Sequence, residues 1–153
     1  MKNESRKRGR LRLDERLQAL QPIDRFRAPP KGWVRALRDA LGMTGAQLGT
    51  RIGVRPQTVD AIEKSEAAGT IQLNTLRRAA EALDCTLVYA LVPNSSLEAV
   101  IEARARKIAT RELQRVAHTM LLEAQGTGES DFESRVQAYI RDRLSERDLW
   151  NET

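Results

Sequence analysis

Cations that could contact phosphate are concentrated at one end of this 153-residue chain. Within residues 1–12 only Glu4 is acidic, and the cations are Lys2, Arg6, Lys7, Arg8, Arg10 and Arg12. The rest of the chain balances its acidic and basic side chains, so this segment accounts for the formal net charge of +5. A basic arm on a neutral body suits phosphate contact or entry into a DNA minor groove. A solvated, disordered tail is the alternative interpretation.

The spacing of three residues further along indicates how the chain could read bases. Gly49 lacks a Cβ, so a second helix can cross close to it. Gly53 can end a helix with a positive φ, and Val59 then provides an apolar contact on the next helix. This spacing is typical of a helix-turn-helix, whose second helix enters the major groove of double-stranded DNA. An ordinary helical hairpin in a bundle is the alternative.

Local residue types support helices on both sides of that turn. Thr44 can cap the first helix, and Gln47 closes a capping box with it. Pro56 suits the first turn of the second helix, where its missing N–H has no intrahelical partner. A loop is expected to follow that helix over residues 64–70. The wedge between the two helices is expected to be filled by Leu48, Ile52, Val54 and Ile62.

Other kinds of chemistry find little support in the sequence. His118 is the only histidine and has no ligand-spaced neighbours, so we expect no metal site, no cofactor and no catalytic triad. The single cysteine, Cys85, cannot form an internal disulfide and fits a reducing cytosol. No apolar run reaches the length of a membrane span. We therefore expect a non-enzymatic, cytoplasmic protein that does not contact membranes.

Composition and periodicity predict an all-α fold in three parts. Residues 1–27 form a basic N-terminal arm and a short helix, and residues 28–93 a five-helix DNA-binding domain. Residues 94–153 form a C-terminal helical extension. The first helix of the DNA-binding domain is expected over residues 32–41, with Trp33, Leu37 and Leu41 on one face and Trp33 in the core.

Two segments after the DNA-binding helices bear on partners. Residues 86–93, TLVYALVP, are rich in β-forming residues and predict either a short strand, paired with its copy in a dimer, or an extended segment across the core. Ser95 and Glu98 predict a capping box at the start of a helix that runs to about residue 125. A last helix is expected over residues 131–149. The apolar stripe of these helices favours a partner helix, in a homodimer or in another protein.

Residues 33–92 resemble the Cro/repressor-type, Xre-like helix-turn-helix domains. The resemblance rests on AQLGTRIGVRPQTVDAIE and on TLRRAAEALDCTL. It implies that Gln47 binds a DNA phosphate and that the start of the second helix meets base edges. The positions concerned are Arg55, Pro56, Gln57, Thr58 and Ala61, and we add Lys64, the cation that directly follows that helix.

These positions differ in what they can offer a base pair. Arg55 stands where the family often has a capping serine or threonine, so it exchanges a cap for a guanine or phosphate donor. Pro56 has no donor, which leaves Gln57 as the main reader, with adenine preferred. Asp60 would repel phosphate, so we expect it to face away or to accept from cytosine.

The whole chain also resembles the proteins called mobile mystery protein A, through PKGWVRALRDALGMTGAQLG, TLVYALVP and ARKIATRELQRVAHTMLLEAQ. That resemblance implies a partner with a Fic domain, an AMP-transferase toxin for which this chain is the antitoxin. Inhibitory helices of such antitoxins carry Ser or Thr, then Glu four residues later, then Gly or Asn. Thr119 and Glu123 match the first two positions, and Ala124 departs from the third.

Together these features predict a DNA-binding regulator that inhibits a Fic-domain partner and represses its own operon. The alternative is a stand-alone dimeric Xre-type repressor whose C-terminal region only dimerises.

Overall fold

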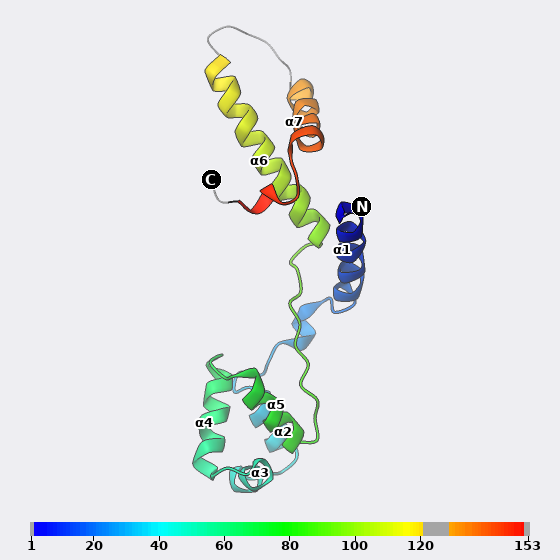
Figure 1. Ribbon diagram of the computed structural model, residues 1–153. Helices are drawn as coiled ribbons and strands as arrows, with labels where there is room; N and C mark the ends of the chain where they lie inside the picture. The colour runs from blue at the N-terminus through cyan, green and yellow to red at the C-terminus, as the bar shows by residue number, and fades with distance from the viewer. Residues whose placement is uncertain (1, 121–128, 152–153) are drawn as a thin grey trace. The chain divides into compact units, whose positions relative to one another are not determined.

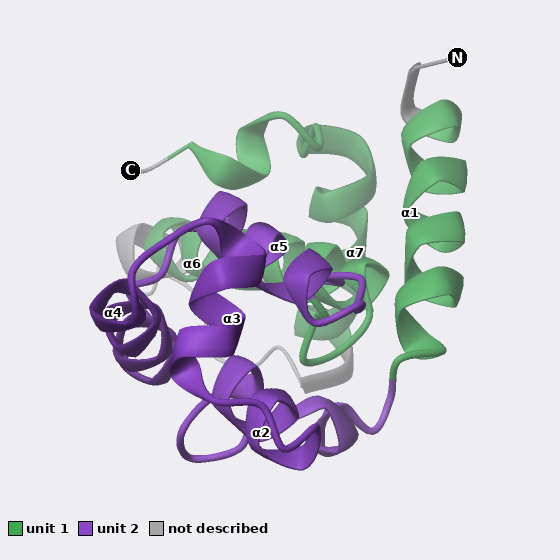
Figure 2. Ribbon diagram, turned by 90° about the horizontal axis from the view of Figure 1, so that it is seen from below, with its two compact units in different colours: residues 1–20, 92–153 green, residues 21–91 purple. Residues whose placement is uncertain are grey.

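The computed structural model describes residues 2–120 and 129–151 of the chain, and every regular element in these residues is helical (Figure 1). The all-α prediction is confirmed for this part of the chain. The fold divides into two compact units, coloured separately in Figure 2. Unit 1 combines residues 1–20 with residues 92–153, and unit 2 comprises residues 21–91. No helix in the described residues is long and apolar enough to cross a membrane.

Unit 2 is a small bundle of four α-helices preceded by a 3-10 turn. The elements are η1 (Ile23–Phe26), α2 (Trp33–Ala40), α3 (Gly45–Ile52), α4 (Pro56–Ala67) and α5 (Leu73–Ala82). Their buried faces share one core, made of Val34, Leu48, Val59, Ile62, Ala79 and Leu83. Unit 2 therefore has a hydrophobic core of its own, which holds α3 and α4 in place.

The prediction of five helices in this domain is wrong for the described structure. After α5 the chain is extended through residues 85–93, with neither helix nor strand in that stretch. The β-forming residues of TLVYALVP oppose a fifth helix, and Pro93 cannot continue one. The segment forms no strand with another part of the described chain, and it does not lie across the core either, since Val88, Tyr89 and Leu91 are 80%, 67% and 87% exposed. Pairing with a second copy stays a prediction.

The buried face of α2 also differs from the expected one. Val34 is 3% exposed and lies in the core, whereas Trp33 is 43% and Leu41 59% exposed. Trp33 is the first residue of the helix and Leu41 is its C-cap. Because both lie at the ends of the helix, α2 contributes Val34 to the core, with Leu37 packed against it, and the prediction that Trp33 is a core residue is wrong.

Unit 1 is built around the long helix α6 (Leu97–Met120), which packs against α1 (Lys2–Gln18), α7 (Glu129–Arg143) and η2 (Asp148–Trp150). Its buried apolar residues are Ala105, Ala109, Val136 and Leu149. Two alanines on α6 let neighbouring elements approach closely. The last helix ends at Arg143 rather than at 149, and the chain then turns back so that Leu149 is buried.

The N-terminal segment is a helix rather than an arm followed by a short helix. α1 begins at Lys2, and its buried Asp14 accepts hydrogen bonds from the first backbone amides of α6, Leu97 at 2.7 Å and Glu98 at 3.3 Å. A carboxylate at a helix N-terminus satisfies unpaired N–H groups and opposes the helix dipole. This contact fixes α1 on α6.

The predicted capping box of Ser95 and Glu98 is therefore wrong. Ser96 is the capping hydroxyl and accepts from the amide of Ala99 at 3.0 Å. The Glu98 carboxylate instead binds Arg10, 3.0 Å away. The Glu98 amide already donates to Asp14, so it is not available to the Ser95 hydroxyl, as the predicted capping box requires.

Candidate nucleic-acid interface

The turn between α3 and α4 has the geometry that the glycines predict. Gly53 is left-handed, with φ +83° and ψ 35°, and its N–H and that of Val54 both donate to the Gly49 carbonyl at 2.8 Å. A Cβ on Gly49 would lie 2.8 Å from the Val54 carbonyl oxygen and 3.4 Å from Val59. Both glycine predictions are confirmed: one ends the helix, and the other allows the close crossing.

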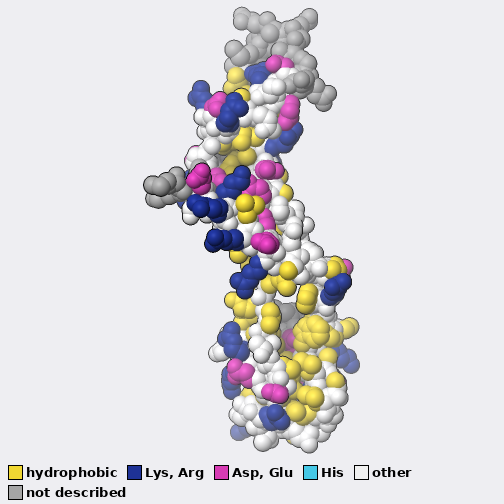
Figure 3. Space-filling model, turned by 90° about the vertical axis from the view of Figure 1, so that its right-hand side faces the viewer, with side chains coloured by type: hydrophobic (Ala, Val, Ile, Leu, Met, Phe, Trp, Pro, Cys, Tyr) yellow, Lys and Arg dark blue, Asp and Glu magenta, His cyan; other side chains and the backbone are white. Residues whose placement is uncertain are grey.

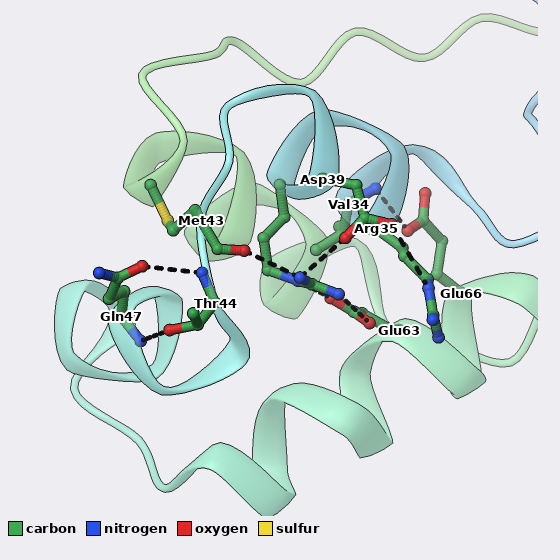
Figure 4. Close-up of polar contacts among 9 residues, drawn as sticks. Val34, Arg35, Asp39, Met43, Thr44, Gln47, Glu63 and Glu66 are labelled. Carbon is green, nitrogen blue, oxygen red and sulfur yellow. Dashed lines mark hydrogen bonds and ion pairs between the residues drawn. The ribbon is translucent and has the colours of Figure 1, made fainter.

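The start of α3 has the predicted capping box (Figure 4). The Thr44 hydroxyl accepts from the Gln47 amide at 3.2 Å, and the Gln47 side-chain oxygen accepts from the Thr44 amide at 2.8 Å. The Gln47 carboxamide is thereby held in one orientation, while its NH₂ group has no partner among the described residues. An oriented amide donor at the N-terminus of an exposed helix is suited to a phosphate oxygen.

Helix α4 has one buried and one exposed face. Val59, Ile62 and Glu63 are buried, while the candidate base- and phosphate-contacting side chains are all exposed: Gln57, Thr58, Ala61 and Lys64. Residues three and four apart lie on the same side of a helix, so Gln57, Ala61 and Lys64 form one outward row. α4 thus presents these residues to solvent from a helix fixed by its other face.

Arg55 precedes this row as the N-cap of α4. Its backbone is extended, with ψ 155°, and its side chain makes no capping hydrogen bond. Pro56 occupies the first turn, as predicted from its missing N–H. The guanidinium of Arg55 is exposed and not used by the helix, so it can donate to a base or a phosphate.

Asp60 and Lys64 form an exposed ion pair at 2.7 Å along α4. Lys64 lies within α4, which runs to Ala67, so the predicted loop from residue 64 is wrong. The pair partly neutralises the cation, and it explains how a carboxylate can stand on a helix proposed to face DNA.

Two contacts that sequence reasoning missed hold α2 against α4. Arg38 and Glu63 form a nearly buried ion pair, with Arg38 Nε 2.6 Å from Glu63 Oε1 (Figure 4). This hydrogen bond raises the pKa of Arg38 above its usual value. Glu66 accepts from the first amides of α2, Trp33 at 2.8 Å and Val34 at 2.9 Å. The sequence signal that could have revealed the ion pair was the position of Glu63, a charged residue on the apolar side of its helix.

The N-terminal cations divide into two groups in unit 1. Arg6, Lys7 and Arg8 are exposed on α1, and none has a partner among the described residues. Arg10 points inward and binds Glu146 at 2.9 Å as well as Glu98. The hydrogen bond to Glu146, and then that to Glu98, raises the pKa of Arg10. Arg10 is therefore occupied inside unit 1, unlike the free cation expected of an arm.

The predicted inhibitory pair falls at the edge of the described structure. Thr119 belongs to the last turn of α6, whereas Glu123 and Ala124 lie outside the described residues. Within those residues no group of His, Cys, Asp and Glu side chains is arranged to hold a metal ion.

Comparison with known families agrees with this geometry. Residues 34–89 match the model of the family described as Helix-turn-helix, and this range runs from α2 into the extended segment that follows α5. Searches of curated proteins and of solved structures found no match. Residues 34–89 are therefore an Xre-type helix-turn-helix domain, a fold characteristic of DNA-binding transcriptional regulators.

Proposed function

We propose that this chain is a sequence-specific transcriptional repressor in which α4 lies in the major groove and Gln57 is the main base reader. The observation that carries the proposal is the exposed row on α4, set on a helix whose opposite face is buried. Gln57 can pair in two points with adenine, while Arg55 and Thr58 extend the contact at the start of the helix. Gln47 and Lys64 position the domain on the phosphates.

The test is selection of a binding sequence from random DNA, together with the DNA upstream of the chain's own gene. Gln57→Ala should cost about 1–3 kcal/mol on the selected sequence and leave non-specific binding unchanged. The matched control is Gln72→Ala, because Gln72 is also exposed in unit 2 and makes no side-chain cap. If no sequence is selected, or if both variants lose equal affinity, the assignment is wrong.

The exposed cations of α1 would add sequence-independent affinity. Replacing Lys7 and Arg8 with glutamine should flatten the salt dependence by about 0.9 for each phosphate that is no longer bound. Deletion of residues 1–12 is a poor test, since it would also remove Arg10 from its two carboxylates. Arg135→Gln with Arg143→Gln, on the exposed surface of α7, is the matched control. An unchanged slope would exclude α1 from the interface.

We further propose that the chain is an antitoxin whose unit 1 binds a Fic-domain partner. The support is the sequence resemblance to the mobile mystery protein A family, together with the exposed Val100 and Val116 on α6, 40% and 46% exposed. Glu123, just beyond the described end of α6, would pair with the arginine that holds the ATP γ-phosphate, and Thr119 would orient it.

This proposal is tested by AMP transfer in the co-expressed partner. Glu123→Ala should release AMP transfer and leave DNA binding intact, whereas Glu102→Ala, an exposed carboxylate on α6, should do neither. Continued inhibition by Glu123→Ala would remove Glu123 from the mechanism. Absence of a Fic reading frame beside the gene would favour the stand-alone dimeric repressor.

A further inference from the structure

A shallow hollow of about 540 Å³ in unit 1, here called the Trp150 hollow, is lined by residues from three separate parts of the chain. Leu13 of α1, Ile101 of α6 and Trp150 of η2 form its apolar part, and Arg6 and Arg147 line it as well. Figure 3 faces α1 and shows basic side chains gathered beside hydrophobic ones on this side of unit 1. An apolar surface with cations beside it fits a ligand that combines a flat apolar group with an anionic one.

Trp150 is exposed although the residue before it is firmly anchored. Leu149 is 2% exposed, and its carbonyl oxygen accepts a hydrogen bond from Arg104 Nε on α6 at 2.7 Å. The indole of Trp150 is nevertheless 56% exposed. Tryptophan is highly buried on average, so an indole held at the surface from an anchored position is available to a ligand. The flat face of a nucleic-acid base is the kind of group that stacks on such a ring.

Gly9 lines the same hollow from the middle of α1. Glycine destabilises a helix interior relative to alanine. Packing within the chain does not require it, because a Cβ built at Gly9 meets no other part of the chain within 4 Å. The missing side chain keeps the hollow open and lets a ligand approach the backbone of α1.

The charges around the hollow favour a ligand whose polar groups are anionic acceptors. Arg10 binds Glu98 at 3.0 Å and Glu146 at 2.9 Å, and so engages the one carboxylate that lines the hollow. Arg6 and Arg147 have no partner among the described residues. Phosphodiester groups offer acceptors alone, which matches two available guanidinium groups. A peptide segment would also bring N–H donors, for which the lining has no unengaged carboxylate.

We propose that the Trp150 hollow binds unpaired nucleotides of a nucleic-acid strand. One base stacks on Trp150, and the adjoining phosphates lie against Arg6 and Arg147. An aromatic platform beside cations is the combination with which proteins hold single strands without reading their sequence. The site lies wholly within unit 1 and goes beyond the major-groove contacts proposed for α4, on which it does not depend.

The experiment is titration of the full chain with fluorescent single strands of about ten nucleotides, thymidine or uridine. Trp150→Ala should weaken binding roughly tenfold or more, the loss expected for one stacked base, while Trp150→Phe should keep most of the affinity. Phe26→Ala is the matched control, because Phe26 is an aromatic residue of unit 2 that is 61% exposed. In a chain with Trp33→Phe, the only remaining indole is that of Trp150, and the strand should quench its emission.

Gly9→Gln separates a role in binding from a role in stability. Glutamine is a better helix former than glycine, so the midpoint of thermal unfolding should rise by about 2 °C. Its side chain would occupy the hollow, so affinity for the single strand should fall even though the chain is more stable. A more stable variant with unchanged affinity would overturn the site.

Arg6→Gln with Arg147→Gln should flatten the salt dependence of single-strand binding by about 0.7 for each phosphate that is no longer bound. Arg135→Gln with Arg143→Gln, on the exposed surface of α7, is the matched control and should leave the slope unchanged. Preference for the thymidine or the uridine strand would identify the source of the nucleotides and support the site.

Three results would overturn the proposal: no saturable binding of either strand, equal weakening by Phe26→Ala and Trp150→Ala, or tighter binding of a glutamate-rich peptide than of the strands. Single-strand binding without selection of a duplex sequence would refute the proposed function alone. Duplex selection without single-strand binding would refute the Trp150 hollow alone.

Discussion

Arg38 on α2 and Glu63 on α4 meet at two points, Nε to Oε1 at 2.6 Å and Nη2 to Oε2 at 3.2 Å. Their side chains are 13% and 7% exposed. Arg38 Nη1 also donates to the Met43 carbonyl at 2.9 Å, so one guanidinium joins α2, the following turn and α4. Helix α4, which we propose to read bases, is thus positioned by an ion pair as well as by the apolar core.

Removal of one member of this pair should be costly. Glu63→Leu alone leaves a nearly buried guanidinium with only the exposed Asp39 carboxylate, 2.9 Å away, and should lower the free energy of unfolding by up to about 3–5 kcal/mol. The double variant Arg38→Met with Glu63→Leu should recover most of that loss. Urea denaturation of the full chain measures both. A single-variant cost below about 1 kcal/mol would mean that the pair behaves as an exposed one.

Gly49 and Gly53, at the turn between α3 and α4, should tolerate alanine much less well than Gly45 does. Gly53→Ala places a Cβ in the left-handed region and should cost about 1–2 kcal/mol. Gly49→Ala should cost about 1–3 kcal/mol, because its Cβ would press on the Val54 carbonyl. Gly45→Ala has open space in the first turn of α3 and should be neutral or stabilising. Thermal unfolding compares the three, and equal effects would contradict this reasoning.

Asp14 should control the start of α6. Asp14→Ala removes the acceptor for two amides and should cost about 0.5–2 kcal/mol, by analogy with the loss of an N-cap. Hydrogen exchange at Leu97 and Glu98 reports the loss directly. The exposed neighbour Glu15 supplies the control, because Glu15→Ala leaves the cap in place. Unchanged protection of both amides in the Asp14 variant would show that water replaces the carboxylate.

Asp60→Asn should tighten binding to DNA of any sequence. The substitution removes a negative charge from the exposed side of α4 and frees Lys64 from its ion pair. The salt dependence should steepen by up to about 0.9 for one additional phosphate bound. Stability should change by less than about 1 kcal/mol, as is typical of an exposed pair. Weaker binding, or a gain confined to one sequence, would place Asp60 at a base instead.

Local patterns predicted the helix-turn-helix well, because its defining features depend on neighbours in sequence. Thr44 caps its helix by accepting from an amide three positions away, and the positive φ of Gly53 depends only on that residue being a glycine. The family comparison finds the domain where those patterns placed it. The candidate DNA-contacting residues on α4 are exposed, as such a role requires, while their contacts with DNA stay predictions.

The wrong predictions concern contacts between side chains that are distant in sequence. Charge counting predicted an arm at residues 1–12, but Arg10 has two carboxylate partners far along the chain, and these make the segment part of a helical unit. The Ser95 and Glu98 spacing predicted a cap that Asp14 displaces. Composition does not reveal such pairings, because the same residues would be solvated if the partner were elsewhere.

The carboxylate caps of α2 and α6 span very different lengths of chain. Glu66 reaches an amide 32 residues away, and Asp14 reaches one 83 residues away. Closure of a longer loop costs more entropy and slows folding. Unit 1 also combines one segment that precedes unit 2 in the sequence with one that follows it. During synthesis the helix-turn-helix domain can complete its core before α6, the packing partner of α1, has been made. We therefore expect the helix-turn-helix domain to fold first.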